Sequence, residues 1–316
     1  MTSPSKVALL VTAMLFFTSA TAGNESSAAN RTAATDLVTR TEALKQKAIK
    51  DLVFIEGGRF QMGDFGPIHS EEKLPYTSQP ENKPLHWVEL DSFSLSRHKV
   101  TYEDFDVFTD ANKKPRIAMA LNDKPYREAP NVPAGLNWPE AKAYCKWLGK
   151  LTGLPFDLPT EAQWEYAARN RGQMVLWPTD NGMWEEGRNI AAYDQRKELL
   201  PTVKFFSPVT VPLALFPPSP LRLYDMTGNG SDWVEDWFSE KYYEVSPEKN
   251  PRGPARGSSK VFRGVESDRE TGLTFYRQHT EPQKKIRYRD SGEVFTDRWP
   301  NIGARCAVQS GRTVSP

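Results

Sequence analysis

Two helix signals lie close together in the segment NWPEAKAYCKWLGKLTGLPFDLPTEAQWEYAAR, and they constrain the fold more than any other feature. Asn137 is a favoured N-cap residue, and Gly153 is placed to end the first helix. Thr160 and Gln163 have the spacing of a capping box, which predicts a second, shorter helix. Apolar residues recur at helical spacing in the first helix, so Cys145 is expected to face the core.

Strand patterns precede these helices. The segment LVFIEGGRFQMGD alternates around Gly57 and Gly58, which predicts a hairpin, and HWVELDSFSLS alternates in the same way. The chain has 25 prolines, 20 glycines and nine tryptophans. This composition favours short regular elements, long loops and a core filled by aromatic side chains. The sequence therefore predicts a loop-rich α+β fold with little regular secondary structure.

The N-terminus has the pattern of a secretory signal peptide. Lys6 precedes an apolar run over residues 7–17, and a small-residue triplet follows at residues 20–22. The apolar run is shorter than the roughly 20 residues that span a bilayer, although a retained N-terminal anchor is the alternative. We therefore expect a signal peptide over residues 1–22 and a soluble, exported protein, periplasmic in a Gram-negative cell, with no transmembrane segment in its mature chain.

The rest of the chain is expected to be a leader and one domain. Residues 23–50 are polar and contain no aromatic residue, which indicates a flexible leader that can be helical over residues 34–50. No later linker divides residues 51–310, so we expect a single domain there. With 41 basic and 40 acidic residues, the net charge is +1, which gives no field that would attract nucleic acid or a membrane surface.

Several segments together resemble one protein family. FIEGGRFQMGD, LNWPEAKAYCKWLGKLTGLPFDLPTEAQWEYAAR, RLYDMTGNGSDWVEDWF, VFRG and IGARCA occur in the order found in the formylglycine-generating enzyme, or sulfatase-modifying factor, family. The resemblance covers about residues 52–308. It implies the formylglycine-generating-enzyme fold, a compact α+β domain related to the C-type lectin scaffold.

The resemblance also exposes a missing catalytic feature. Enzymes of this family oxidise a cysteine of a target sulfatase with molecular oxygen and with copper bound between two cysteines just after the VFRG strand. Soft thiolate ligands select Cu(I). No cysteine occurs between Cys145 and Cys306 in this chain. The departure from the family pattern implies that the protein binds no copper, that it has no catalytic residues of this type and that it is a pseudoenzyme.

The two cysteines match other positions of the family. Cys145 in AYCKW and Cys306 in GARCA correspond to a long-range structural disulfide that joins the first of these helices to the last strand. The resemblance therefore implies a Cys145–Cys306 disulfide. Two free buried thiols are the alternative.

A structural calcium site is also implied by the resemblance. In the family, a GNVWEW-like turn and an upstream Asn-Ile pair supply oxygen ligands, which suit calcium. Here the turn contains Asn229 and Gly230, and the upstream pair is Asn189 and Ile190. The residues that follow Gly230 depart from the family motif, so an Asn-Gly turn held by its own side chain is the alternative.

No other catalytic motif is present. The four histidines lack the spacing of zinc or iron ligands, and the sequence contains no G-x-S-x-G, P-loop or dinucleotide motif.

Two loops are candidates for a binding surface. Residues 172–220 and 268–299 replace the walls of the family's active site, and they are rich in the aromatic and arginine residues found at binding hot spots. The alternative is that many of these side chains fill the core. The candidate residues are Trp177, Trp184, Tyr276, Arg277, His279 and Arg289.

Two functions from different classes remain. The first is an exported, non-catalytic protein that binds a periplasmic protein or a small ligand, as do periplasmic regulators and immunity-type factors encoded with type VI secretion systems. The second is an oxidoreductase of the formylglycine-generating or siderophore-maturation type that uses a site without cysteine. The missing cysteines favour the first.

Overall fold

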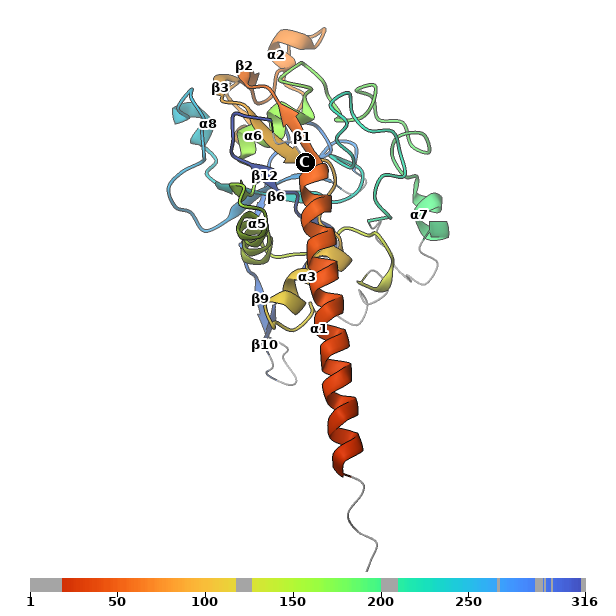
Figure 1. Cartoon of the computed structure of the whole chain (residues 1–316). Helices are drawn as coiled ribbons and strands as arrows, with labels where there is room; N and C mark the ends of the chain where they lie inside the picture. Colours follow the sequence, from red (N-terminus) through yellow and green to blue (C-terminus); the bar gives the residue numbers. More distant parts are fainter. Residues whose placement is uncertain are drawn as a thin grey trace, which may run out of the picture.

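The computed structural model describes residues 19–117, 127–199, 210–265, 268–287, 292, 294–296 and 298–313. Short helices and strands joined by long loops form one body, from which a long N-terminal helix extends (Figure 1). This confirms the predicted loop-rich α+β fold. The helices are α1 (Ser19–Lys50), α2 (Gly66–His69), η1 (Pro80–Asn82), α3 (Tyr102–Ala111), α5 (Trp138–Thr152), α6 (Glu161–Ala168), α7 (Tyr193–Leu199) and α8 (Tyr242–Val245).

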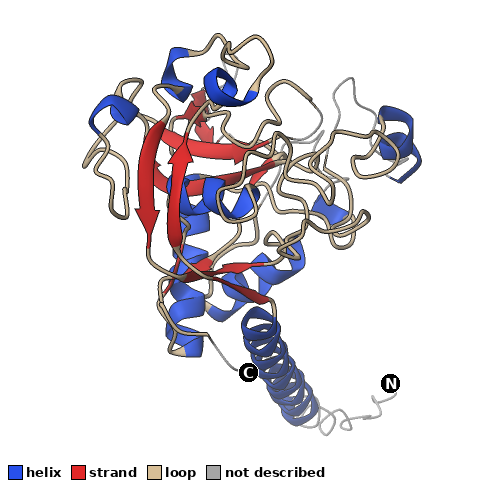
Figure 2. Cartoon of the chain, turned by 90° about the horizontal axis from the view of Figure 1, so that it is seen from above, coloured by secondary structure: helices blue, strands red, loops and turns tan. Residues whose placement is uncertain are grey.

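The strands form small sheets that run in different directions (Figure 2). One four-stranded sheet has the order β1-β4-β12-β5, and the other has the order β11-β6-β7-β8. Two-stranded sheets join β2 to β3 and β9 to β10. The strands are β1 (Leu52–Ile55), β2 (Gly58–Met62), β3 (His86–Leu90), β4 (Phe93–Ser96), β5 (Phe156–Asp157), β6 (Ser231–Trp237), β7 (Lys260–Gly264), β8 (Gln278–Thr280), β9 (Lys285–Arg287), β10 (Val294–Thr296), β11 (Ile302–Gly303) and β12 (Ala307–Val308).

Both helices predicted from capping signals are present. Asn137 caps α5 in a capping box, and the helix ends at Gly153 in the left-handed conformation, with φ 76°. Thr160 and Gln163 form the predicted capping box of α6. All residues of α6 are buried, and the helix contacts strands β2, β3, β6 and β7. The acidic side chains of α6 therefore lie in the interior of the domain.

The hairpin predicted around Gly57 and Gly58 is wrong. β1 pairs with β4, and β2 pairs with β3, so the two strands enter different sheets. A Cβ atom at Gly57 would lie 2.2 Å from the carbonyl oxygen of Leu90. The glycine therefore allows two backbones to approach closely, instead of forming a tight turn.

Within the leader predicted over residues 23–50, the helix expected over residues 34–50 is present as the C-terminal part of α1, which begins earlier, at Ser19 (Figure 1). Leu44 and Ala48 are buried where α1 packs against α3 and α5. The Lys47 ammonium lies 2.7 Å from the carboxylate of Asp104. These two apolar residues, four positions apart, lie on one face of α1 and pack its last turns against the domain, although the leader is polar overall.

Residues 1–18 of the predicted signal peptide lie outside the described residues, and its last four residues form the start of α1. Among the described residues, no helix has the length and apolar character needed to cross a membrane.

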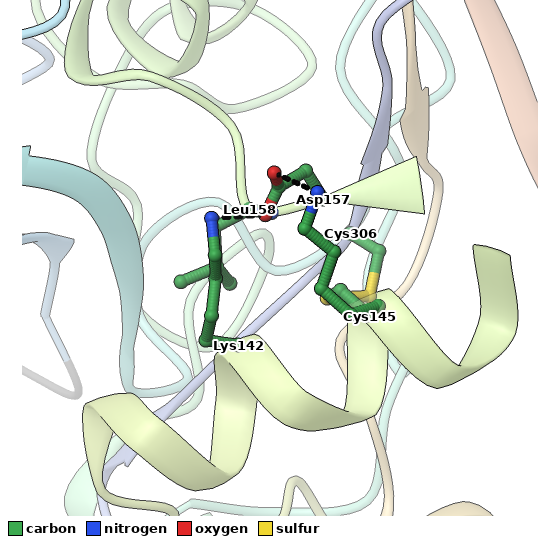
Figure 3. The surroundings of a disulfide bond; sticks show 6 residues. Lys142, Cys145, Asp157, Leu158 and Cys306 are labelled. Carbon is green, nitrogen blue, oxygen red and sulfur yellow. Dashed lines mark hydrogen bonds and ion pairs between the residues drawn. A yellow bond between two sulfur atoms is a disulfide. The ribbon is translucent and has the colours of Figure 1, made fainter. Parts of the chain in front are cut away.

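The predicted disulfide is present between Cys145 on α5 and Cys306 before β12, with Cα atoms 5.6 Å apart (Figure 3). Lys142 of the same helix contacts Asp157 of β5 at 2.6 Å. Because β5 pairs with β12, the covalent bond and the ion pair both fasten α5 to one sheet.

Candidate functional site

A cleft of about 660 Å³ lies beside the connection that follows β7. We call it the main cleft. Its lining comes from residues 76–79, residues 176–177 and the segment 269–276. The last of these segments belongs to the connection in which the family resemblance places the copper-binding cysteines.

Two walls of the main cleft are joined directly. The indole Nε1 of Trp177 donates to the carbonyl oxygen of Arg269 at 3.0 Å, and the Arg269 guanidinium lies 4.8 Å from the centre of the Trp177 ring. Nearby, the Thr274 amide donates to the carbonyl oxygen of Leu176 at 2.8 Å. These contacts hold the 176–177 and 269–276 segments together without a ligand.

The third wall is held by a buried carboxylate. Asp64 has no exposed surface, and its Oδ1 and Oδ2 accept the backbone amides of Tyr76 and Thr77 at 3.1 and 2.9 Å. The ring of Tyr76 also stacks against Phe275, with centroids 6.2 Å apart. The segment that presents Thr77 to the main cleft is thus anchored in the core.

Tyr276 lies half-buried in the wall of the main cleft. Burial raises the pKa of its hydroxyl, and the carboxylates of Glu81, Asp268 and Glu270 act in the same direction. The main cleft therefore combines aromatic surface with hydroxyl groups and charges of both signs. Such a set suits recognition of a ligand by stacking and hydrogen bonding.

No thiol is available for copper in this chain, because the sequence has two cysteines and both are in the disulfide. Among the described residues, no group of three or more His, Cys, Asp or Glu side chains is placed to hold a metal ion.

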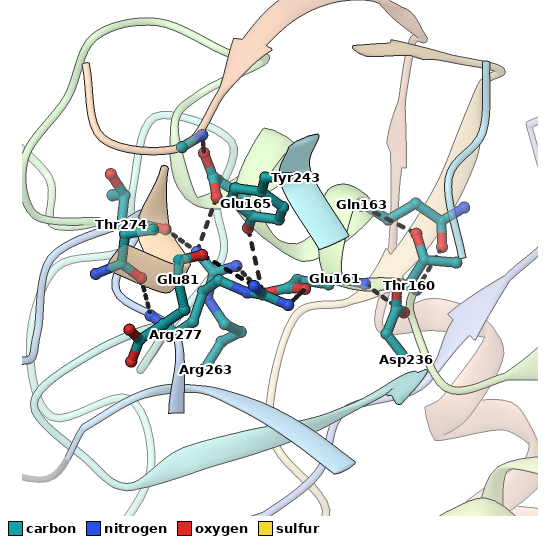
Figure 4. Close-up of polar contacts among 12 residues, drawn as sticks. Glu81, Thr160, Glu161, Gln163, Glu165, Asp236, Tyr243, Arg263, Thr274 and Arg277 are labelled. Carbon is teal, nitrogen blue, oxygen red and sulfur yellow. Dashed lines mark hydrogen bonds and ion pairs between the residues drawn. The ribbon is translucent and has the colours of Figure 1, made fainter. Parts of the chain in front are cut away.

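Arg277 was predicted on the binding surface, and the structure corrects this. Only 1% of its surface is exposed. Its Nε and Nη2 donate to the two carboxylate oxygens of Glu161 at 2.8 and 3.0 Å (Figure 4). Although burial opposes it, the Glu161 carboxylate holds the pKa of Arg277 above its ordinary value. Arg277 is a core residue.

The network around Arg277 extends through the interior (Figure 4). Arg263 donates to Glu161 and to Glu165, each at 2.9 Å. Burial opposes ionisation of Glu161, but Arg277 and Arg263 hold its pKa below the usual range. At the edge of the network, burial raises the pKa of Asp236 to about 8. The network is a buried structural core, and none of these arginine and glutamate residues lines the main cleft.

The other predicted binding residues have different positions. Trp184 and Trp177 are both buried, at 8% and 7% exposed, and belong to one apolar cluster with Phe65. Trp177 also lines the main cleft, whereas Trp184 does not, so the assignment of Trp184 to the binding surface is also corrected. His279 is exposed and stacks on Phe238, with centroids 3.6 Å apart, but does not line the main cleft. Arg289 lies outside the described residues.

Two of the six candidates, Trp177 and Tyr276, thus line the main cleft. Arg269 and Glu270 lie in the predicted loop 268–299 but were not among the six named candidates, and the 76–79 segment was not predicted at all. Arg269 and Glu270 follow the VFRG strand closely, so their position after a family motif was a usable signal. The 76–79 segment gave none, because its place depends on the buried Asp64.

The residues predicted for calcium come together in part. Asn189, Ile190 and Asn229 line one cavity of about 20 Å³, whereas Gly230 does not line it. Asp225 adds a carboxylate to the same cavity. The volume suffices for one water or ion, and hard oxygens are the donors that calcium prefers.

The asparagine side chains at this cavity also have structural partners. Oδ1 of Asn229 accepts the Val211 amide at 2.8 Å, and its Nδ2 donates to Asp225 at 3.1 Å. Oδ1 of Asn189 accepts the amide of Glu185 at 2.9 Å. The cavity offers the carboxylate and amide oxygens that calcium prefers, and the charged oxygens among them come from Asp225. The two asparagines also hold the backbone around the cavity.

The fold and the position of the main cleft define a domain of the formylglycine-generating type, and comparison with known proteins agrees. Residues 38–310 match the family described as the sulfatase-modifying factor enzyme 1-like domain. The protein belongs to this family.

The relatives include proteins named as formylglycine-generating enzymes and one whose name says that it is inactive. The chain is 37% identical to the formylglycine-generating enzyme of Streptomyces coelicolor, over 70% of this chain and 80% of that protein. It is 24% identical to the inactive C-alpha-formylglycine-generating enzyme 2 of Bos taurus, over 83% of this chain and 89% of that protein.

A third kind of relative is much longer. The serine/threonine-protein kinase Pkn1 of Chlamydia trachomatis is 32% identical, over 72% of this chain and 35% of the kinase. The chain thus corresponds to about a third of that protein's length. Among solved structures, PvdO from Pseudomonas aeruginosa shares the fold, with a TM-score of 0.58, 24% identity and coverage of 81% of this chain and 93% of PvdO.

Proposed function

We propose that the protein is a non-catalytic member of the sulfatase-modifying factor family that binds a partner protein or a small ligand in the main cleft. One observation carries this proposal: the cleft that follows β7 has a volume of about 660 Å³, while the chain has no free thiol. The relative in Bos taurus is named an inactive formylglycine-generating enzyme, which supports the view that the family includes members without formylglycine-generating activity.

The lining of the main cleft favours binding over a merely structural gap. Trp177 and Arg269 join two walls, and Asp64 anchors the third, so the shape exists before a ligand arrives. A site that is ordered in advance loses less conformational entropy on binding. Exposed Arg269 and Glu270 add charges that can orient a polar partner.

A substitution that places a bulky charged side chain in the main cleft tests the proposal. Thr271 lines the cleft, and Ser258 is exposed elsewhere, so Thr271→Arg and Ser258→Arg add the same charge at different places. We expect a periplasmic extract to yield a partner that wild type and Ser258→Arg retain and that Thr271→Arg binds at least about tenfold more weakly. Equal retention by all three proteins would contradict binding in the cleft.

The finer form of the proposal places the protein in the periplasm, as a regulator or immunity factor of a type VI secretion system. The N-terminal pattern supports export, and the disulfide is of a kind that persists in oxidising compartments. We expect cleavage after Ala22. N-terminal sequencing tests this, and an intact Met1 in the membrane fraction would count against it.

The link to type VI secretion rests on analogy at the family level, and inspection of neighbouring genes tests it.

We also propose that the cavity beside Asn189 and Asn229 binds calcium, with Asp225 as the charged ligand. Asp225 has a positive φ of 53°, a conformation that asparagine adopts readily, so Asp225→Asn is a mild substitution for the backbone. Saturating calcium is expected to raise the Tm of wild type by about 5 °C over a chelator-treated sample. The variant should not respond; equal responses of the two proteins would contradict the site.

A further inference from the structure

A second cleft, which we call the polar cleft, lies away from the main cleft and shares no lining residue with it. Its volume is about 310 Å³. Its walls come from four separate parts of the chain: residues 90–92 at the end of β3, the start of α6, the loop at residues 250–252 and the segment 309–311. The resemblance to known enzymes assigns nothing to this place.

Two pairs of hydrogen bonds hold the walls of the polar cleft. The amide groups of Gln163 and Gln309 donate to each other at 2.8 and 3.0 Å. Asn250 donates to the carboxylate of Asp91 at 2.8 Å and accepts the Asp91 backbone amide at 2.9 Å. Each pair joins segments that are far apart in sequence, so the shape of the polar cleft is set before any ligand binds.

The polar cleft offers charges of opposite sign. The carboxylate of Asp91 is 69% exposed, and its nearest cationic group is the Lys249 ammonium at 3.9 Å. Arg252 is exposed and makes no side-chain hydrogen bond or ion pair within the described part of the chain. An unpaired guanidinium presents several donors in a fork that fits a carboxylate, and a carboxylate accepts from an ammonium group.

The remaining lining selects against apolar ligands. Besides Leu90, the walls present amide, hydroxyl and backbone groups, including Ser92 and Thr160. A mainly polar pocket gains little from burying a hydrocarbon, so its ligand has to be hydrophilic. A volume of about 310 Å³ suits a molecule of the size of an amino acid or a dipeptide.

We propose that the polar cleft binds a free α-amino acid, with Arg252 on the carboxylate and Asp91 on the ammonium group. This site does not depend on the function proposed for the main cleft. A zwitterion carries the two charges that complement the lining residues Asp91 and Arg252, whereas a simple anion would meet the repulsion of Asp91 and a simple cation that of Arg252.

Calorimetric titration of the full chain with L-glutamine and L-serine tests the proposal. We expect saturable binding to wild type, weakened at least about tenfold by Arg252→Gln and by Asp91→Asn. Arg256→Gln alters another exposed arginine of the same loop, outside the polar cleft, and should bind as wild type does. N-acetylated and amidated forms of the bound amino acid, which each lack one charge, should bind at least about tenfold more weakly.

Three results would overturn the proposal. These are the absence of saturable binding of both amino acids at millimolar concentration, binding that Arg252→Gln leaves unchanged, and binding that Thr271→Arg abolishes, which would place the amino acid in the main cleft. Because Asp91 and Arg252 are exposed, their variants are expected to fold, and circular dichroism checks this.

Discussion

Replacing Cys145 and Cys306 together by alanine is expected to lower the free energy of unfolding by about 5 kcal/mol. The disulfide spans 161 positions of the sequence and fastens α5 to the sheet that contains β12. In the chain-entropy description, a cross-link across so long a loop removes much of the freedom of the unfolded chain, and its loss restores that freedom.

Denaturant titration of the oxidised wild type and of the double variant measures the difference. Wild type titrated in the presence of a reductant provides a matched control, because its folded state lacks the bond but keeps both sulfur atoms in the buried core. Reduced wild type and the double variant should both be far less stable than the oxidised protein. Equal stability of the three, or two alkylatable thiols in native protein, would contradict the disulfide.

Arg277→Ala is expected to destabilise the fold by about 3–5 kcal/mol, because it leaves Glu161 without its two-point partner in a buried site. Arg263 still contacts Glu161, so part of the charge stays compensated. The loss should appear as a lower midpoint of denaturation, and binding at the main cleft should weaken only in proportion to the unfolded fraction.

Arg269→Ala is the matched control for this prediction. Arg269 is exposed at the main cleft and contacts Trp177 through its guanidinium, so its removal should cost about 1 kcal/mol or less in stability. If Arg277→Ala were as stable as wild type but unable to bind a partner, Arg277 would belong to the binding surface, as predicted from the sequence, and its assignment to the core would be wrong.

The parts of the fold that could be predicted from the sequence depend on local signals or on family motifs. The caps of α5 and α6 involve residues three positions apart, so Asn137 and Thr160 could be assigned from the sequence alone. The disulfide followed from the resemblance. Strand pairing around Gly57 was mispredicted, because the partner strands lie far along the chain, and alternation does not show which strands pair.

The candidate site shows the same division. Trp177 and Tyr276 were found by residue type, but the same reasoning placed Arg277 on the surface. Its partner Glu161 is 116 positions earlier in the sequence, and nothing local to Arg277 shows that a buried carboxylate faces it. An arginine at a binding hot spot and one in a buried ion pair look alike in a sequence. The seating of α1 through Leu44 was missed because its partners also lie in distant elements.

The proposed lack of formylglycine-generating activity can be tested directly. Purified protein is incubated with copper, oxygen and a sulfatase-type peptide that contains the target cysteine, and the aldehyde is measured by mass spectrometry. The formylglycine-generating enzyme of Streptomyces coelicolor serves as the positive control, and copper with peptide alone gives the background.

We expect no aldehyde above the background. The stretch after β7 offers Asp268, Arg269, Glu270 and Thr274 where the family resemblance places thiolates, and these side chains do not hold Cu(I). Both cysteines are buried in the disulfide, so neither can take the place of the missing pair. Aldehyde formed above the copper background, and lost when Thr271→Arg obstructs the main cleft, would show that the protein is an enzyme and would contradict the proposal that it is a non-catalytic binding protein.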